Sequence, residues 1–194
     1  MNEFPVVVIG ASTGALEAVR QIIERLPPDC GAGVALVMHV GAHPSHLADI
    51  LKWYAPLPVS FGQDGETFMP GHVYIAPSDL HMRLVPPGCI QLDRGAKLHF
   101  TRPAVDPLFA SAAATFGRRT IGIILGGEGT DGAEGLRAIR ARGGVALVQD
   151  PREAAVREMP EAAIAGDGPE IVPTRQLARR VASFCSSFAE RRGG

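Results

Sequence analysis

The sequence predicts an α/β fold, in which helices cover both faces of a doubly wound, mostly parallel central sheet. Two observations support this prediction. Short runs of apolar residues, too continuous to be half-exposed strands, alternate along the chain with segments of helical periodicity. Glycine, proline or hydroxyl residues bound these runs and mark where strands and helices end. Such alternation is typical of parallel strands that are joined by helices.

The first part of the chain supplies three strands and two helices to this scheme. Apolar residues face both ways in its strands, and its first helix stops at Pro27-Pro28. The expected elements are, in order, a strand at 6–9, a helix at 16–26, a strand at 34–40, a helix at 45–54 and a strand at 58–62.

From about residue 65 to 102 the pattern changes to short apolar runs that are interrupted by proline and glycine, which predicts a hairpin-rich insertion. Asp106-Pro107 then opens a helix, with Asp106 as its expected cap. The remaining expected elements are strands at 121–125, 145–148 and 171–172 and helices at 133–141 and 177–188. With no repeat or linker in the sequence, residues 1–194 are expected to form a single domain.

Composition excludes several classes of protein. The 194 residues are 46% hydrophobic and 20% charged, with a net charge of −1, so they predict an ordered domain without a basic surface for nucleic acid. Cys30, Cys89 and Cys185 are too far apart to indicate a disulfide framework or a thiolate metal site. No segment approaches the roughly 20 apolar residues of a membrane span, and none is typical of a signal peptide. A cytoplasmic location without membrane insertion is therefore expected.

Three polar residues follow predicted buried strands. Ser12 comes after the first strand, His39 at the end of the second, and Asp131 after the strand at 121–125. Because ligands and chemistry gather at the carboxyl ends of parallel strands, these side chains are expected to meet. A serine nucleophile needs a base, and a carboxylate orients that base. The three residues therefore predict a catalytic triad.

Each residue also has a structural interpretation. Ser12 or Thr13 suits the cap of the following helix, and Asp131 with Glu134 matches an Asp-x-x-Glu capping pattern. A lone histidine such as His39 is more often a hydrogen-bonded core residue than a base. Only the coincidence at three strand ends favours the catalytic interpretation.

Two other kinds of site are less well supported. The run from Gly10 to Gly14 lacks the lysine of a phosphate-binding loop and does not match G-x-G-x-x-G, which disfavours a nucleotide. His39, His43 and His46, with Asp49 beyond, are close in sequence, but they span a strand end, a loop and a helix start. No metal or organic cofactor is therefore expected.

Five separated blocks resemble CheB-type methylesterase domains of bacterial chemotaxis and cover about residues 6–184. They are VVVIGASTGALEAV, VMHV, DGETFMPGHVYIAPSDLHM, TRPAVDPLF and GGEGTDGAEGLRAIRARGG, and MPEAAI fits as well. The resemblance implies hydrolysis of glutamate γ-methyl esters on methyl-accepting chemoreceptors, with deamidation of receptor glutamines as a second reaction. It also implies Ser12 as nucleophile, His39 as general base and Asp131 as the orienting acid.

The resemblance further implies an oxyanion hole near Thr13 and Gly14, with a backbone N–H from the position of Glu128. The cleft that receives a receptor side chain is expected to be shallow, rimmed by Arg102 and by residues 65–81, including His81.

The chain departs from the family pattern at three points. Met38 replaces a usual glutamine, and Leu125-Gly126-Gly127-Glu128-Gly129 replaces Leu-Thr-Gly-Met-Gly. A carboxylate at Glu128 would repel the oxyanion or stabilise protonated His39 if it turned inward, but we expect it to face solvent. No receiver domain precedes the first strand, so the protein is expected to act without phosphoryl control or with a separate receiver or signalling protein. A non-catalytic module that docks to receptors, and an esterase for a different ester, remain the alternatives.

Overall fold

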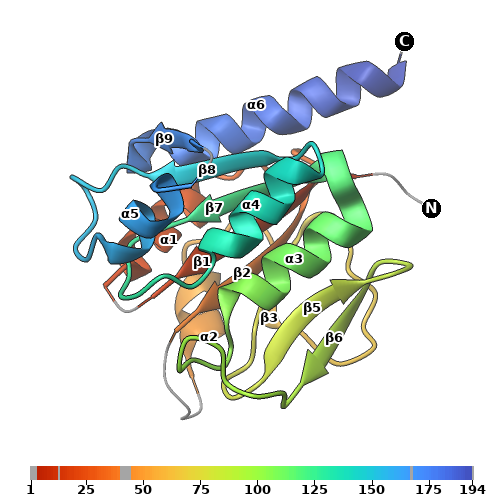
Figure 1. Cartoon of the computed structure of the whole chain (residues 1–194). Helices are drawn as coiled ribbons and strands as arrows, with labels where there is room; N and C mark the ends of the chain where they lie inside the picture. The colour runs from red at the N-terminus through yellow and green to blue at the C-terminus, as the bar shows by residue number, and fades with distance from the viewer. Residues whose placement is uncertain (1–3, 13, 40–44, 167, 194) are drawn as a thin grey trace.

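A computed structural model describes residues 4–12, 14–39, 45–166 and 168–193 and, in those ranges, shows a central sheet of seven parallel strands (Figure 1). The order across the sheet is β3-β4-β2-β1-β7-β8-β9, and a separate antiparallel pair, β5-β6, lies beside it. The predicted α/β class is therefore confirmed.

The strands agree with the predicted positions to within a few residues, apart from those of the middle segment. The sheet strands are β1 Val6–Ala11, β2 Gly33–Met38, β3 Val59–Phe61, β4 His72–Ile75, β7 Thr120–Ile124, β8 Val145–Gln149 and β9 Glu170–Val172. The antiparallel pair is β5 His81–Val85 and β6 Cys89–Asp93. The helices are α1 Leu16–Glu24, α2 Leu47–Lys52, α3 Val105–Phe116, α4 Ala133–Ala141, α5 Glu158–Ile164 and α6 Thr174–Gly193, with a short 3-10 turn at Gly117–Arg119.

Each face of the sheet has its own apolar core. In β1, Val7 and Ile9 pack toward α1, α2 and α6, whereas Val6 and Val8 pack toward α3, α4 and α5. All of β1 is buried because helices cover both faces, which explains why its sequence is continuously apolar rather than alternating.

The segment at 65–102 is only partly the hairpin insertion that the sequence predicts. β5 and β6 pair as a hairpin, but β4 is a parallel strand of the central sheet, between β2 and β3. Four residues carry too little periodicity to distinguish a buried parallel strand from one arm of a hairpin. The helix α5 was not predicted either.

The topology gathers the predicted site at one edge of the sheet. β1 lies between β2 and β7, with Ala11 paired to Met38 and Gly10 to Ile124, so these three strands end side by side. Within the described residues, no helix combines the length and the apolar character that a membrane span requires.

Candidate active site

Ser12 lies at the end of β1 and is held through its backbone. Its side chain is buried, its N–H donates to Gly126 O at 3.1 Å, and its carbonyl accepts from Ala15 N at 3.0 Å. The cap position of α1 is Ala15, and no side chain in the described part of the chain caps that helix end, so Ser12 is not a helix cap. Thr13, the other candidate cap and an expected oxyanion donor, lies outside the described residues. Gly127 packs directly against Ser12, since a Cβ added there would lie 2.4 Å from Ser12 Cβ.

His39 occupies the equivalent position on the neighbouring strand. Its N–H donates to Ala11 O at 3.0 Å, which places His39 and Ser12 one residue beyond the last pair of the ladder, Ala11 and Met38. Adjacent strands are about 5 Å apart, so the two side chains leave backbones that are close together. The imidazole Nε2 lies 2.9 Å from Asp131 Oδ2.

Asp131 joins this edge of the sheet to the start of α3. Its carboxylate accepts the N–H of Val105 at 2.7 Å and of Asp106 at 3.0 Å, the first two residues of that helix. The prediction that Asp131 and Glu134 cap the following helix is therefore wrong. α4 begins after Gly132, and Asp131 caps a helix that is remote in sequence.

The hydrogen bonds keep the Asp131 carboxylate ionised. Burial alone would raise its pKa, but the hydrogen bond to His39 and the two backbone donors outweigh burial and lower the pKa below the ordinary aspartate value. A charged carboxylate therefore faces the His39 imidazole.

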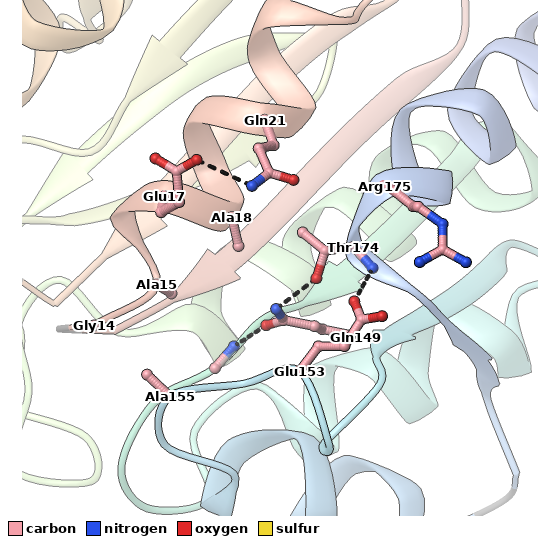
Figure 2. A pocket seen from close by; sticks show the side chains of 11 residues that line it. Gly14, Ala15, Glu17, Ala18, Gln21, Gln149, Glu153, Ala155, Thr174 and Arg175 are labelled. Atoms are coloured by element: carbon pink, nitrogen blue, oxygen red, sulfur yellow. Dashed lines mark hydrogen bonds between the residues drawn. The ribbon is translucent and has the colours of Figure 1, made fainter.

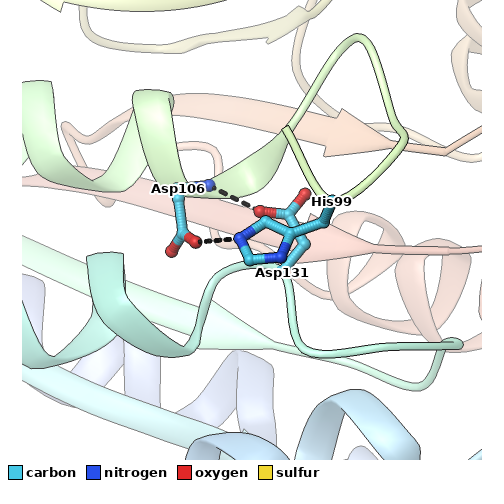
Figure 3. A group of neighbouring side chains, drawn as sticks. All are labelled: His99, Asp106 and Asp131. Carbon is cyan, nitrogen blue, oxygen red and sulfur yellow. Dashed lines mark hydrogen bonds and ion pairs between the residues drawn. The ribbon is translucent and has the colours of Figure 1, made fainter. Parts of the chain in front are cut away.

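Asp106 and His99 extend the network beyond Asp131 (Figure 3). Asp106 was expected to cap its own helix, but Ala104 holds the cap position, and the Asp106 carboxylate instead accepts Gly135 N–H at 2.7 Å. His99 Nε2 lies 3.0 Å from Asp106 Oδ2. Burial, followed by the charge of Asp131, raises the pKa of Asp106.

Within the described residues, His99, Asp106 and Asp131 also form the one group of three whose ligand atoms lie close enough to hold a metal, within 4.8 Å of one another. Each of these side chains already has hydrogen-bond partners in the protein. The earlier histidine set is arranged differently: His39 contacts Asp131, while the exposed His46 lies 3.7 Å from Asp49. His43 lies outside the described residues.

Most of the first backbone donors in the loop after β7 are occupied. The N–H groups of Leu125, Gly126, Gly127 and Gly129 donate, respectively, to Gly10 O, Gln149 Oε1, Val156 O and Glu158 Oε2. Among the described residues, the N–H of Glu128 has no acceptor, and the Glu128 side chain is exposed, as we expected. Gly14, on the other side of Ser12, is exposed and has a φ of +94°.

Arg102 is engaged within its own loop. Its guanidinium donates to Asp79 Oδ1 at 2.6 and 3.0 Å and to the carbonyls of Arg94 and Gly95 at 3.2 and 2.8 Å. Arg102 lowers the pKa of Asp79 through these hydrogen bonds. Its place on a substrate rim stays a prediction.

His81 does not line the rim, because its side chain is only 1% exposed. Its Nε2 contacts Ala96 O at 3.0 Å, and its Nδ1 accepts Ala104 N–H at 3.2 Å. The expectation from the sequence is corrected here: His81 supports the segment that leads into α3.

A cavity of about 430 Å³ opens at the same edge of the sheet, between the starts of α1 and α6 (Figure 2). Gln149 forms part of its wall: the buried amide accepts Gly126 N–H and donates to Thr174 Oγ1, both at 2.8 Å. The cavity therefore adjoins the backbone that holds Ser12, and no sequence pattern indicates it.

A sequence model of the family described as CheB methylesterase matches residues 7–181. The chain belongs to the CheB methylesterase family. A protein-glutamate methylesterase/protein-glutamine glutaminase of Thiobacillus denitrificans is 39% identical over 190 residues, which are 95% of this chain and 53% of that protein. One of the same name from Chromohalobacter salexigens is 43% identical over 166 residues, covering 83% and 47%.

The solved catalytic domain of the Thermotoga maritima CheB methylesterase superposes with a TM-score of 0.88 at 33% identity, covering 94% of this chain and 99% of that one. The chain thus spans about half the length of the curated relatives it matches, and nearly all of a solved catalytic domain of this family.

Proposed function

We propose that this CheB-family chain is a cytoplasmic serine hydrolase that removes methyl esters from glutamate side chains of chemoreceptors and deamidates receptor glutamines. The observation that carries the proposal is the 2.9 Å contact between His39 and Asp131 at the strand edge where Ser12 ends the neighbouring strand. The names of the relatives supply the substrate class.

In the proposed reaction, Ser12 Oγ attacks the ester carbonyl carbon while His39 accepts the hydroxyl proton. The proton then passes to the leaving oxygen, and methanol departs to leave an acyl-serine. Water, deprotonated by His39, attacks that acyl group, and the proton returns to Ser12 as the glutamate is released. Asp131 holds the imidazole and stabilises its charged form throughout.

The N–H of Glu128 would donate to the oxyanion that develops in this reaction, because it has no acceptor among the described residues. The N–H groups of the neighbouring Gly126, Gly127 and Gly129 are occupied, so the backbone on both sides of this open donor is fixed. Loss of one such donor in serine hydrolases costs roughly 10²- to 10³-fold in rate.

Replacing the nucleophile tests the proposal. Ser12→Ala should lower methanol release from a methylated receptor fragment by at least about 10³-fold without changing the thermal unfolding midpoint. Ser183→Ala, on the exposed side of α6, is the matched control and should retain full activity. Full activity of Ser12→Ala would reject the mechanism. Loss of wild-type activity on addition of EDTA would indicate that the reaction depends on a metal ion.

The alternative function is a non-catalytic module that docks to receptors. In the sequence, the carboxylate of Glu128 was the feature that favoured it, but the side chain is exposed in the structure and gives this alternative no support. Wild-type protein that binds a receptor fragment but releases no methanol at any pH would nevertheless select it, and activity toward other esters alone would select a different substrate. Adding a phosphorylated receiver protein in trans tests the regulation that the sequence left open.

A further inference from the structure

The loop between β6 and α3 contains a tight turn of unusual composition. Leu98 and Thr101 exchange both backbone hydrogen bonds, at 3.1 and 2.8 Å, and the two residues between them, His99 and Phe100, have φ values of +49° and +63°. Two-residue loops with positive φ at both positions strongly favour Asn-Gly and similar pairs, because larger L-residues are strained there. This turn therefore carries an aromatic residue at a conformational cost.

The turn is anchored beside the proposed triad. The His99 ring contacts Asp106 at 3.0 Å. Thr101 Oγ1 donates to Leu98 O at 2.9 Å and also lies 3.4 Å from Asp131 Oδ2, the same oxygen that faces His39. Phe100 is thus one residue away from a side chain that contacts the proposed orienting acid.

Phe100 itself does not pack against the protein. Its side chain is 96% exposed, more than any other large hydrophobic side chain among the described residues, and the neighbouring Leu98 is 40% exposed. A phenylalanine presents on the order of 200 Å² of surface, which here stays in water. A strained backbone that holds an apolar side chain away from its own core is a functional feature more often than a stabilising one.

The loop that carries Phe100 also carries two exposed basic residues. Arg94 and Lys97 are exposed there, and their charges, after that of Arg102, help to lower the pKa of Asp79 without a direct ion pair. An exposed apolar side chain on a loop with exposed basic residues is complementary to a peptide segment that carries both apolar and acidic side chains.

We propose that Phe100 is a substrate-positioning residue that contacts an apolar side chain of the protein segment carrying the esterified glutamate. On a helical substrate, an apolar residue three or four positions from that glutamate lies about 5–6 Å away on the same face. The inference rests on the proposed function, because it names how that site selects a protein substrate over a small ester.

Kinetics on two substrates test the role. Phe100→Ala should raise the KM for a methylated chemoreceptor cytoplasmic fragment at least about 10-fold, while kcat and the hydrolysis of N-acetyl-glutamate γ-methyl ester stay within twofold of wild type. Phe100→Tyr keeps the ring and should restore the KM. Trp53→Ala removes an 87% exposed aromatic residue beyond the far end of α2 and should leave all rates unchanged.

A second variant separates docking from folding. Asparagine tolerates positive φ, so Phe100→Asn should unfold at the same temperature as wild type or higher and yet show the weak KM of Phe100→Ala. Equal losses on the protein and the small ester would mean that Phe100 acts only by holding Thr101 and Asp131, and would overturn the proposal.

Binding distinguishes this failure from failure of the proposed function. In a Ser12→Ala background, fluorescence anisotropy of the labelled receptor fragment should show a Kd at least about 10-fold weaker when Phe100 is replaced by alanine. Unchanged Kd and KM in an active enzyme would overturn the role of Phe100 alone. An inactive wild type would overturn the proposed function, and the Kd comparison would still decide whether Phe100 docks the fragment.

Discussion

Gly127→Ala should remove most activity by displacing Ser12. A Cβ at Gly127 would lie 2.4 Å from Ser12 Cβ and 2.4 Å from Met159 Sδ, whereas carbon atoms in contact are normally about 3.5 Å apart or more. The φ of Gly127 is not positive, so alanine meets no backbone strain there, and the effect isolates steric contact.

The size of the effect follows from which neighbour can move. The Met159 thioether is flexible and can turn aside, but Ser12 Cβ is bonded directly to a backbone that ends β1 and pairs with Gly126. Restoring contact distance requires a shift of about 1 Å, and such misplacement near the chemistry costs about 10²-fold in rate. Overpacking also costs about 1–3 kcal/mol, or roughly 2–12 °C in the unfolding midpoint for a domain of this size.

Steady-state methanol release and thermal unfolding measure the two effects together. Gly31→Ala is the matched control: its φ of +62° makes alanine strained, yet nothing lies within 4 Å of the added Cβ. It should lose comparable stability, about 1 kcal/mol or more, and keep its activity. Activity of Gly127→Ala within threefold of wild type would show that the position of Ser12 does not matter, and equal losses in both variants would point to stability instead.

Three further results are expected. Asp131→Asn should lower kcat by about 10³- to 10⁴-fold. Because the folded-state pKa of Asp131 is lowered, wild type should be more stable than this variant in urea, fully so above about pH 4, and the difference should disappear as the pH falls through the folded-state pKa. A stability difference that does not depend on pH would contradict this. The Cys185 thiol lowers the pKa of Cys30 by donating a hydrogen bond, so mass spectrometry should detect alkylation of Cys30 by iodoacetamide at a lower pH than for an ordinary thiol. The midpoint should shift upward in Cys185→Ala, and an unchanged midpoint would show that the contact is absent. Arg102→Ala should speed limited proteolysis of the loop that Arg102 holds through Gly95 and Asp79. Arg102→Lys should restore protection only in part, because lysine lacks the planar guanidinium. Unchanged cleavage would show that other contacts fix the loop.

Much of this architecture could be predicted because the signals are local. Apolar runs such as that of β1 identify buried parallel strands, and parallel strands end at a common edge, so the neighbourhood of Ser12 and His39 follows from the chain alone. Contacts that depend on tertiary packing could not be predicted in this way.

Asp131 illustrates the limit most clearly. Its local sequence matches the cap of α4, but the fold brings the start of α3 closer, and two backbone donors there take the carboxylate. The burial of His81 likewise depends on Ala96 and Ala104, which reach it only when the loop folds back over β5. The contact between Cys30 and Cys185 joins the loop between α1 and β2 to α6, and no sequence spacing indicates it.

The hydrogen bonds of Asp131 also decide which nitrogen of His39 would serve as the base in the proposed triad. The pKa of Asp131 is lowered, so near neutral pH its carboxylate accepts rather than donates, and the proton of the Asp131–His39 contact belongs to Nε2. The basic lone pair of the neutral ring is then on Nδ1, the nitrogen nearer the backbone. In the chymotrypsin arrangement the two nitrogens have the opposite roles. Ser12 leaves the strand next to that of His39, so the proposed triad requires its hydroxyl to reach Nδ1, the reverse of the chymotrypsin arrangement.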